Sequence, residues 1–336
     1  MPTHRGISDI EGVSLHMDAA PGRGQCCHNQ AMLTVTVPDT DLVERLSDLT
    51  DRVEFVQWDL LSALPPDVAA RVSVVQIGHY WGDPARWHRL PEAANLRYVL
   101  LPSAGFEHAL PHLPSGVTLC NGRGVHSAGT AELAMMLILA SQRGLIDAID
   151  AQREGRWLNP ELASLADRRV LIVGAGSLAE ALAARLRPFE VELTMVGRTA
   201  RDGVHGIDEL PVLLAQTDVV VLTVPYSPDT HHLLDAAALA ALPDGALVVN
   251  VARGRVVDTD ALLAELTSGR LRAGLDVTDP EPLPSDHPLW RAPNTIITAH
   301  QGGNSNATYP RVAALLRRQL EHLLADEPLE NVVAVG

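Results

Sequence analysis

Short apolar segments alternate with helical segments along most of this chain and limit it to a small set of folds. Five segments rich in β-branched residues come first: Met32–Val37, Val53–Trp58, Val72–Ile77, Tyr98–Leu101 and Val117–Leu119. A second, more regular series follows: Val170–Val173, Val191–Val196, Val219–Val224, Ala246–Val251, Gly274–Val277 and Thr295–Thr298. Helical patterns near residues 178–187, 230–241 and 259–268 separate members of the second series. This alternation predicts βαβ units and parallel sheets.

The charged residues exclude several classes of function. All 26 Lys and Arg residues are arginine, so the chain lacks the lysine of Schiff-base enzymes and of Walker-type phosphate loops. The ordinary interpretation of this bias is codon usage in a GC-rich genome, and the exclusions hold whatever its cause. The formal charge is −15 without any basic run, which argues against nucleic-acid or anionic-membrane partners. No apolar run of about 18 residues and no hydrophobic signal core occurs, so we expect a cytoplasmic protein.

The cysteines indicate neither a disulfide framework nor a zinc framework. Cys26, Cys27 and Cys120 are odd in number and lack C-x-x-C spacing. The run Cys26-Cys27-His28 offers metal ligands, but residues 1–30 have no apolar period and fit a flexible leader with adventitious thiols better. We therefore expect no metal site.

A glycine-rich turn follows the first strand of the second series. Residues 174–179 read G-x-G-x-x-A and open a helix. Gly174 permits the tight turn, Gly176 lets a diphosphate approach the backbone, and Ala179 replaces the third glycine where helix and strand pack closely. The helix N-terminus offers unpaired N–H groups to the diphosphate. The turn predicts a dinucleotide site with contacts from Gly174, Ala175, Gly176, Ser177 and Leu178.

The end of the next strand indicates which dinucleotide binds. An NAD-selective site carries Asp or Glu about 20 residues past the first glycine, where it holds the ribose 2′-hydroxyl. Here residues 196–201 contain no carboxylate and include Arg198, Thr199 and Arg201. Guanidinium groups pair with a 2′-phosphate, which an Asp would repel. The segment predicts a preference for NADP(H) over NAD(H), the alternative being two solvated loop arginines.

Three more segments lie at or just past predicted strand ends, where ligands bind in open α/β sheets. They are Asn250–Asp258 (NVARGRVVD), Leu275–Leu283 (LDVTDPEPL) and Ile297–His300 (ITAH). Further motifs are the glycine-rich turn, Val224-Pro225, Asp229-Thr230 and Pro288-Leu289-Trp290. On these segments together, the chain from about residue 31 onward resembles the D-isomer-specific 2-hydroxyacid dehydrogenase family. Many relatives have a glycine in place of Ala179 and a proline in place of Ala299. Both replacements keep the residue small, so we expect function to be retained.

The resemblance implies that Arg253, Glu281 and His300 form the catalytic set. Arg253 would bind the carboxylate and ketone of a 2-keto acid, His300 would protonate the developing alkoxide, and Glu281 would orient the imidazole and stabilise its charged form. Taken singly, each residue also fits an ordinary structural role. Asp276 would hold the nicotinamide carboxamide, unless it caps the next turn, and Ser103, Ala104 and Gly105 would bind the substrate carboxylate. The remaining cofactor-side candidates are Val224, Pro225, Thr230, Val251, Ala252 and Gly302.

The expected fold is an α/β protein with two doubly wound parallel-sheet domains. A Rossmann cofactor domain at residues 125–300 is inserted into a flavodoxin-like substrate domain, which residues 31–124 and 301–336 form. An apolar helix at Ser127–Arg143, with Ser127 as a possible N-cap, is the expected contact surface of the homodimer that the resemblance implies. A helix near residues 306–325 returns to the first domain.

The expected function is hydride transfer between NADP(H) and a small 2-keto or 2-hydroxy acid of the glyoxylate, hydroxypyruvate or pyruvate type. The alternative is a dehydrogenase-like binding module that senses nucleotide without significant turnover; Arg198 and Arg201 favour the enzyme. The sequence leaves the substrate side-chain pocket open, because several aromatic residues either line it or fill a core. These are Trp81, Trp87, Phe106, Trp290 and Tyr309. His231 and His232 are expected on the surface at a helix start.

Overall fold

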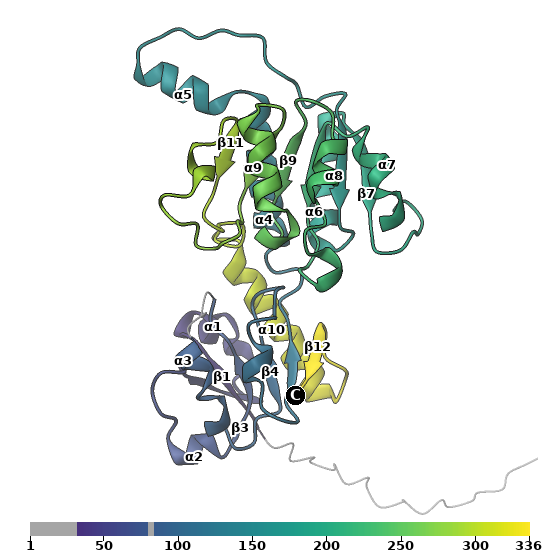
Figure 1. The fold of residues 1–336 in the computed structure, drawn as a ribbon. Helices are drawn as coiled ribbons and strands as arrows, with labels where there is room; N and C mark the ends of the chain where they lie inside the picture. Colours follow the sequence, from purple (N-terminus) through teal and green to yellow (C-terminus); the bar gives the residue numbers. More distant parts are fainter. Residues whose placement is uncertain (1–31, 80–83) are drawn as a thin grey trace, which may run out of the picture. The chain divides into compact units, whose positions relative to one another are not determined.

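Two six-stranded sheets organise the part of the chain that the computed structural model describes, residues 32–79 and 84–336 (Figure 1). The first sheet has the order β2-β1-β3-β4-β5-β12, in which β12 runs antiparallel to β5 and the other described pairs are parallel. Its strands are β1 (Leu33–Val37), β2 (Val53–Gln57), β3 (Val72–Gln76), β4 (Tyr98–Leu100), β5 (Thr118–Cys120) and β12 (Val332–Val335).

The second sheet is wholly parallel and has the order β7-β6-β8-β9-β10-β11. Its strands are β6 (Arg169–Val173), β7 (Glu192–Val196), β8 (Val219–Leu222), β9 (Leu247–Asn250), β10 (Arg272–Leu275) and β11 (Thr295–Ile297). The chain reverses its winding direction between β6 and β8, and such a switch point is where ligands bind in doubly wound sheets. The predicted α/β fold with two doubly wound sheets is confirmed, because the first sheet also reverses its winding direction once, between β1 and β3. Strand β12 returns to the first sheet after the second sheet is complete.

Alternating side chains of the second sheet enter two apolar layers. Val170 and Ile172 of β6 are buried in one layer, and Leu171 and Val173 are buried in the other. The first layer includes helices α4 (Ser127–Gln142) and α6 (Ser177–Leu186), and the second includes α7 (Leu210–Leu214), α8 (Ala236–Ala241) and α9 (Thr259–Thr267). Strands that are covered on both faces have continuous apolar sequences, and this pattern allowed the strands of the second sheet to be predicted.

The first sheet is covered in the same way by shorter helices. One apolar layer includes residues of α1 (Thr40–Arg45) and of the long helix α10 (Thr308–Ala325). The opposite layer includes Trp87, at the end of α3 (Pro84–Trp87), and Val68 of α2 (Pro66–Ala69). The predicted final helix is therefore confirmed, and it packs on the sheet to which the first part of the chain contributes.

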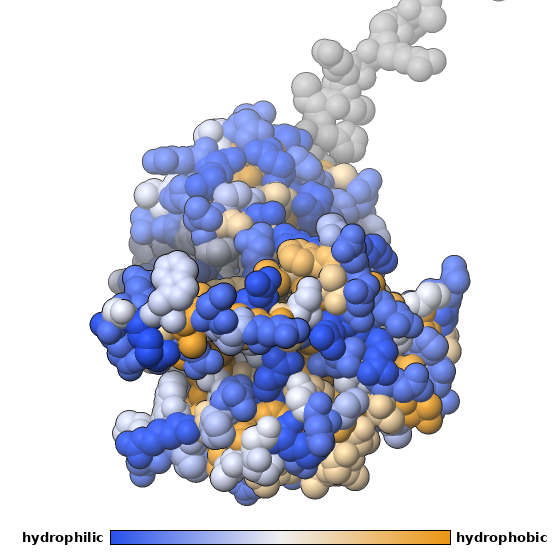
Figure 2. Space-filling view, turned by 90° about the horizontal axis from the view of Figure 1, so that it is seen from above, coloured by the Kyte–Doolittle hydropathy of each residue, from blue (hydrophilic) through white to orange (hydrophobic). Residues whose placement is uncertain are grey.

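Several large apolar side chains remain on the surface near helix α5 (Leu145–Arg153), which the sequence did not predict. They are Met136, Leu145, Ile146, Trp157, Leu158 and Leu162. Figure 2 views the molecule from the side on which α5 lies in Figure 1 and shows apolar patches among mainly hydrophilic residues. Within residues 32–79 and 84–336, none of the helices combines the length and the hydropathy of a transmembrane span.

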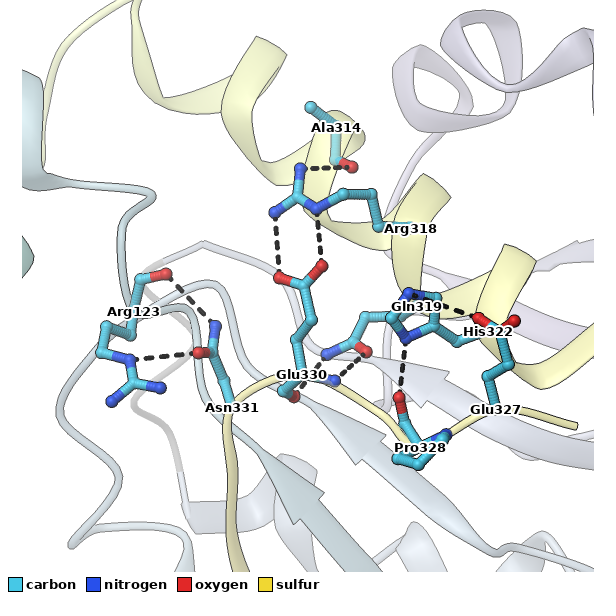
Figure 3. Close-up of polar contacts among 9 residues, drawn as sticks. All are labelled: Arg123, Ala314, Arg318, Gln319, His322, Glu327, Pro328, Glu330 and Asn331. Atoms are coloured by element: carbon cyan, nitrogen blue, oxygen red, sulfur yellow. Dashed lines mark hydrogen bonds and ion pairs between the residues drawn. The ribbon is translucent and has the colours of Figure 1, made fainter.

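The C-terminal segment is fastened to α10 and to the loop after β5 (Figure 3). The Arg318 guanidinium donates to both carboxylate oxygens of Glu330, at 2.8 and 3.2 Å. Gln319 exchanges two hydrogen bonds with the backbone of Glu330. Asn331 accepts from Arg123 Nε and donates to the Arg123 carbonyl oxygen. These contacts hold β12 against β5 and cover an edge that would otherwise expose unpaired backbone groups.

The local structure corrects two predictions. Ser127 is not the N-cap of α4: His126 occupies that position without a capping side-chain bond, and the Ser127 hydroxyl instead lies 3.1 Å from that of Ser177. The helix predicted over 230–241 begins only at Ala236, where the Asp235 carboxylate accepts from a backbone N–H. Residues 228–230 form a separate 3-10 helix, so His231 and His232 do not start a helix. The leader predicted at residues 1–30 lies outside the described residues.

Candidate active site

The glycine-rich turn has the space and the backbone that a dinucleotide requires. Gly174 has φ +125°, and a Cβ there would lie 2.2 Å from Thr223 Oγ1 at the end of β8, so only glycine fits at the switch point. A Cβ on Gly176 would meet no atom within 4 Å, which leaves open space beside the N-terminus of α6. Ala179 is fully buried in the layer between α6 and the sheet. These residues fit a diphosphate held by backbone N–H groups.

Two arginines follow β7 beside this turn. Arg201 donates from Nη2 to the Ala175 carbonyl oxygen at 2.8 Å, which brings its guanidinium to the glycine-rich turn. Arg198 and Thr199 are exposed. The Arg198 side chain has no hydrogen bond or ion pair with any residue of the described ranges, so its guanidinium is available to a ligand.

The three predicted catalytic residues follow three adjacent strands, β9, β10 and β11. Asn250 at the end of β9 shapes the first of these loops: its side chain accepts from the Ala252 N–H and donates to the Arg253 carbonyl oxygen, both at 3.0 Å. Because carboxyl ends of parallel strands share one edge of a sheet, Arg253, Glu281 and His300 are brought together there.

Glu281 and His300 form a hydrogen-bonded pair. Nδ1 of His300 bonds Oε1 of Glu281. Burial raises the pKa of Glu281, but the hydrogen bond and charge of His300, together with the charge of Arg253, outweigh burial and hold that pKa below its usual value. The carboxylate is therefore ionised at neutral pH, and the imidazole presents its other nitrogen, Nε2, away from Glu281.

Asp276 holds the backbone around His300. This residue is 3% exposed and accepts hydrogen bonds from the Thr298 hydroxyl and from the N–H groups of Gln301 and Gly302, at 2.7 to 2.9 Å. The His300 N–H donates to the Asp276 carbonyl oxygen at 2.7 Å. His300 itself has φ +51°, a left-handed conformation that costs a residue with a side chain about 1–2 kcal/mol. The Asp276 contacts keep this conformation in place.

Arg253 lies against the loop that follows β4. Its Nη1 donates to the Ala252 carbonyl oxygen at 2.6 Å, and its Nη2 lies 1.9 Å from where a Cβ on Gly105 would be. The Ser103 hydroxyl donates to the Gly105 carbonyl oxygen and Asn121 donates to the Ala104 carbonyl oxygen, so side chains fix the loop from within. The predicted substrate loop, which follows a strand of the first sheet, thus lies against Arg253, which follows a strand of the second sheet.

A cavity of about 760 Å³ collects many of these groups. The predicted residues that line it are Ser103, Ala104, Gly105, Ser177, Leu178, Val251, Arg253, Asp276, Glu281, His300 and Gly302. The predicted residues outside its lining are Gly174, Ala175, Gly176, Arg198, Thr199, Arg201, Val224, Pro225, Thr230 and Ala252. Among the described residues, no three His, Cys, Asp or Glu side chains are placed to hold a metal ion, and Cys26 to His28 lie outside this part of the chain.

The cavity also contains residues that the sequence did not single out. They are His79, Glu107, His108, His126, Tyr226 and Arg255. His79 follows β3 just as the catalytic candidates follow their strands. Its position after a predicted strand could therefore have identified it as a site candidate from the sequence. The rings of His79 and His126 meet edge to face, with centroids 4.9 Å apart. Burial, and then the charges of His79, His300 and Arg253, lower the pKa of His126 to about 4.

None of the described aromatic candidates lines the cavity. Trp87 is 3% exposed within a core, and Phe106 packs against the same core. Tyr309 donates to Asp39, and Trp290 donates to the Pro284 carbonyl oxygen. Trp81 lies outside the described residues. The aromatic candidates named from the sequence therefore do not border this cavity, and Tyr226 is an aromatic residue of its lining.

Comparison with known proteins identifies the family of this chain. Residues 135–302 match the model of the D-isomer specific 2-hydroxyacid dehydrogenase, NAD binding domain. The chain is 33% identical over 252 residues to the human glyoxylate reductase/hydroxypyruvate reductase, covering 71% of this chain and 77% of the relative. It is 32% identical over 250 residues to a glyoxylate reductase of Thermofilum pendens, covering 70% and 74%.

Two solved structures match nearly the whole chain. A D-isomer specific 2-hydroxyacid dehydrogenase family protein from Aeromonas salmonicida has a TM-score of 0.79 at 27% identity, covering 91% of this chain and 100% of that one. A D-isomer specific 2-hydroxyacid dehydrogenase from Xanthobacter autotrophicus in complex with NADPH and MES has a TM-score of 0.74 at 29% identity, covering 90% and 98%. The chain therefore belongs to the D-isomer-specific 2-hydroxyacid dehydrogenase family and is an NAD(P)-dependent oxidoreductase.

Proposed function

We propose that this protein reduces small 2-keto acids of the glyoxylate, hydroxypyruvate or pyruvate type and prefers NADPH. The observation that carries the proposal is the hydrogen-bonded pair of His300 and Glu281 in the same cavity as Arg253, which lies against Gly105. A cation and a backbone loop can bind the carboxylate of a 2-keto acid, and a proton donor can protonate the oxygen of its ketone as that ketone is reduced. The relatives named for glyoxylate and hydroxypyruvate reduction support this substrate class.

Arg253 is the substrate-binding cation of the proposal. Its planar guanidinium pairs with the substrate carboxylate and polarises the ketone oxygen through charge-assisted hydrogen bonds, each of about 1.5–3 kcal/mol. The loop of Ser103, Ala104 and Gly105 presents its backbone to the same carboxylate. This contact fixes the ketone relative to His300.

His300 is the general acid. Because Nδ1 faces Glu281, Nε2 gives the proton to the ketone oxygen as that oxygen gains charge, and the carbon–oxygen double bond becomes the C–OH bond of the 2-hydroxy acid. Glu281 stays ionised and stabilises the imidazolium before transfer. In the oxidative direction, Nε2 accepts the proton. Acid catalysis of this kind contributes roughly 10²- to 10⁴-fold to the rate.

The cofactor would lie along the glycine-rich turn, with Asp276 next to its nicotinamide. When bound, NADPH supplies the hydride that adds to the ketone carbon. The turn at Gly174 to Leu178 holds the diphosphate, and Arg198 with Arg201 pairs with the 2′-phosphate. The support for NADPH is that Arg198 has no partner among the described residues and that Arg201 already contacts the turn.

The homodimer that we propose uses the surface at α5. Helix α4 is largely buried within its own chain, with Ala134, Leu137 and Ile138 as core residues. The apolar surface beside it is better suited to a partner subunit: Leu145, Ile146, Leu158 and Leu162 are exposed, and Trp157 is 94% exposed. We expect Trp157→Arg to convert a dimer to a monomer in sedimentation velocity, and a monomeric wild-type protein would refute the proposal.

A panel of 2-keto acids assayed with NADPH and with NADH tests the enzyme proposal. We expect turnover of glyoxylate, hydroxypyruvate or pyruvate with a higher kcat/KM for NADPH. Arg198→Gln should lower that preference, and Arg291→Gln, at an exposed arginine outside the cavity, is the control. Turnover with NADH alone would refute the cofactor assignment, and no turnover at all would favour a nucleotide-sensing module.

A His300→Gln variant tests the acid. We expect kcat at neutral pH to fall by roughly 10²- to 10⁴-fold while the Kd for NADPH, measured by fluorescence titration, stays unchanged. An unaffected kcat would mean that another group supplies the proton.

A further inference from the structure

Four carboxylates line the cavity within the described residues, and three of them are engaged. Asp276 accepts from the Thr298 hydroxyl and two backbone N–H groups, Asp279 faces Arg255 at 3.4 Å, and Glu281 bonds His300. The fourth, Glu107, has no hydrogen bond or ion pair with any residue in ranges 32–79 and 84–336. Its side chain is exposed, so a ligand bound in the cavity can reach the carboxylate.

The cations of the cavity show the matching pattern. Arg255 is paired with Asp279 and His300 with Glu281. Arg253 donates to a backbone oxygen but has no carboxylate partner in the described part of the chain. After the internal pairs are set aside, the cavity offers one guanidinium and one carboxylate.

These two groups converge on Gly105. The point where a Cβ on Gly105 would stand lies 1.9 Å from Arg253 Nη2 and 3.2 Å from Glu107 Oε2. No ion pair joins the two side chains, so both remain open to a molecule bound at the loop. His108, next in sequence, does not cancel the carboxylate, because burial lowers the pKa of its imidazole and keeps it neutral at neutral pH.

We propose that Glu107 is a specificity-determining residue that recognises a cationic group on the side chain of the 2-keto acid. This inference rests on the proposed function, because Arg253 must bind the carboxylate of the same molecule. The reaction itself is unchanged: hydride adds to the ketone carbon and the proton from His300 goes to the oxygen. Glu107 acts only on which acid is bound.

The expected selectivity follows from charge. Opposite charges attract more strongly in a partly enclosed site than in bulk water, and an exposed pair contributes less than a buried one. We therefore expect a cationic acid to exceed a neutral acid of similar length by about five- to tenfold in kcat/KM. Repulsion from the same carboxylate disfavours an acid that carries a second negative charge.

Three acids of similar length, assayed with NADPH, separate these effects. They are 5-guanidino-2-oxopentanoate, which is cationic, 2-oxohexanoate, which is neutral, and 2-oxoadipate, which is anionic. We expect kcat/KM to decrease in that order in the wild-type protein. In Glu107→Gln we expect the cationic acid to lose about five- to tenfold, the neutral acid to stay within twofold, and the anionic acid to improve. Glu161→Gln, at an exposed glutamate outside the cavity, should change none of these values.

Calorimetric titration of the same acids into the NADP⁺-loaded protein gives the Kd of each acid, so the order of affinities is measured independently of turnover. A ranking that Glu107→Gln leaves unchanged, or the absence of binding by all three acids, overturns the inference. An equal fall in KM for all three acids in Glu107→Gln also overturns it, because it would mean that Glu107 competes with the substrate for Arg253. Absence of wild-type turnover with glyoxylate, hydroxypyruvate and pyruvate alike would instead refute the proposed function.

Discussion

His126 makes the stability of this protein depend on pH in a way that one substitution can isolate. Its Nε2 is buried without a hydrogen-bond partner among the described residues, and its ring contacts that of His79. Burial, followed by the charges of His79, His300 and Arg253, lowers its pKa from 6.5 to about 4. Between pH 6.5 and about pH 4, the His126 imidazole is therefore mostly neutral in the folded chain and mostly protonated in the unfolded chain.

The sign and size of the effect follow from proton linkage. Because the unfolded chain holds more protons, the free energy of unfolding falls as the pH falls below 6.5, and the loss is complete below about pH 4. Between pH 8 and pH 5 the loss is about 2 kcal/mol, at roughly 1.36 kcal/mol per pKa unit. The depressed pKa of Glu281 acts in the same direction only at lower pH, where that carboxyl takes up a proton.

Urea unfolding followed by circular dichroism at pH 8, 6 and 5 measures this loss. We expect His126→Gln, which cannot be protonated, to lose about 2 kcal/mol less than the wild type over the same interval. His231→Gln, at an exposed histidine outside the cavity, is the matched control and should follow the wild type. If His126→Gln lost as much stability as the wild type between pH 8 and 5, the burial of a neutral imidazole would not be the cause.

Two further variants probe the candidate site. In Gly105→Ala the new methyl group would lie 1.9 Å from Arg253 Nη2, so the guanidinium must move. We expect KM for the 2-keto acid to rise at least about tenfold, equivalent to 1.4 kcal/mol, with an unchanged Kd for NADPH. An unchanged KM in steady-state kinetics would contradict the assigned position of Arg253. In Asp276→Asn the loss of charge weakens the contacts to residues 298–302. Because a hydrogen bond to a charged group contributes about 1.5–3 kcal/mol, we expect kcat to fall about 10- to 100-fold while the circular dichroism spectrum is retained. A normal kcat would show that these contacts do not hold His300.

Local pattern predicted most of the fold because each buried strand carries its own signal. The apolar runs at β6, β8 and β9 are covered on both faces, and the glycine-rich turn needs a positive φ at Gly174 that only glycine adopts easily. The strand β12 escaped prediction because Val332 and Val335 are exposed and the strand is held by pairing with β5 and by the contacts of Glu330 and Asn331. Helix α5 escaped because its apolar residues face outward.

The dinucleotide turn, the strand-end positions of Arg253, Glu281 and His300, and the absence of lysine from any cationic role follow from the amino-acid sequence. These depend on short-range order, since a parallel sheet brings the ends of neighbouring strands to one edge. Three features become visible only in the folded chain: Arg253 lies against Gly105, Asp276 holds the backbone at His300, and Glu107 and His126 line the same cavity. Those contacts join residues far apart in the chain, and packing between two separately wound sheets leaves no periodic signal in either segment.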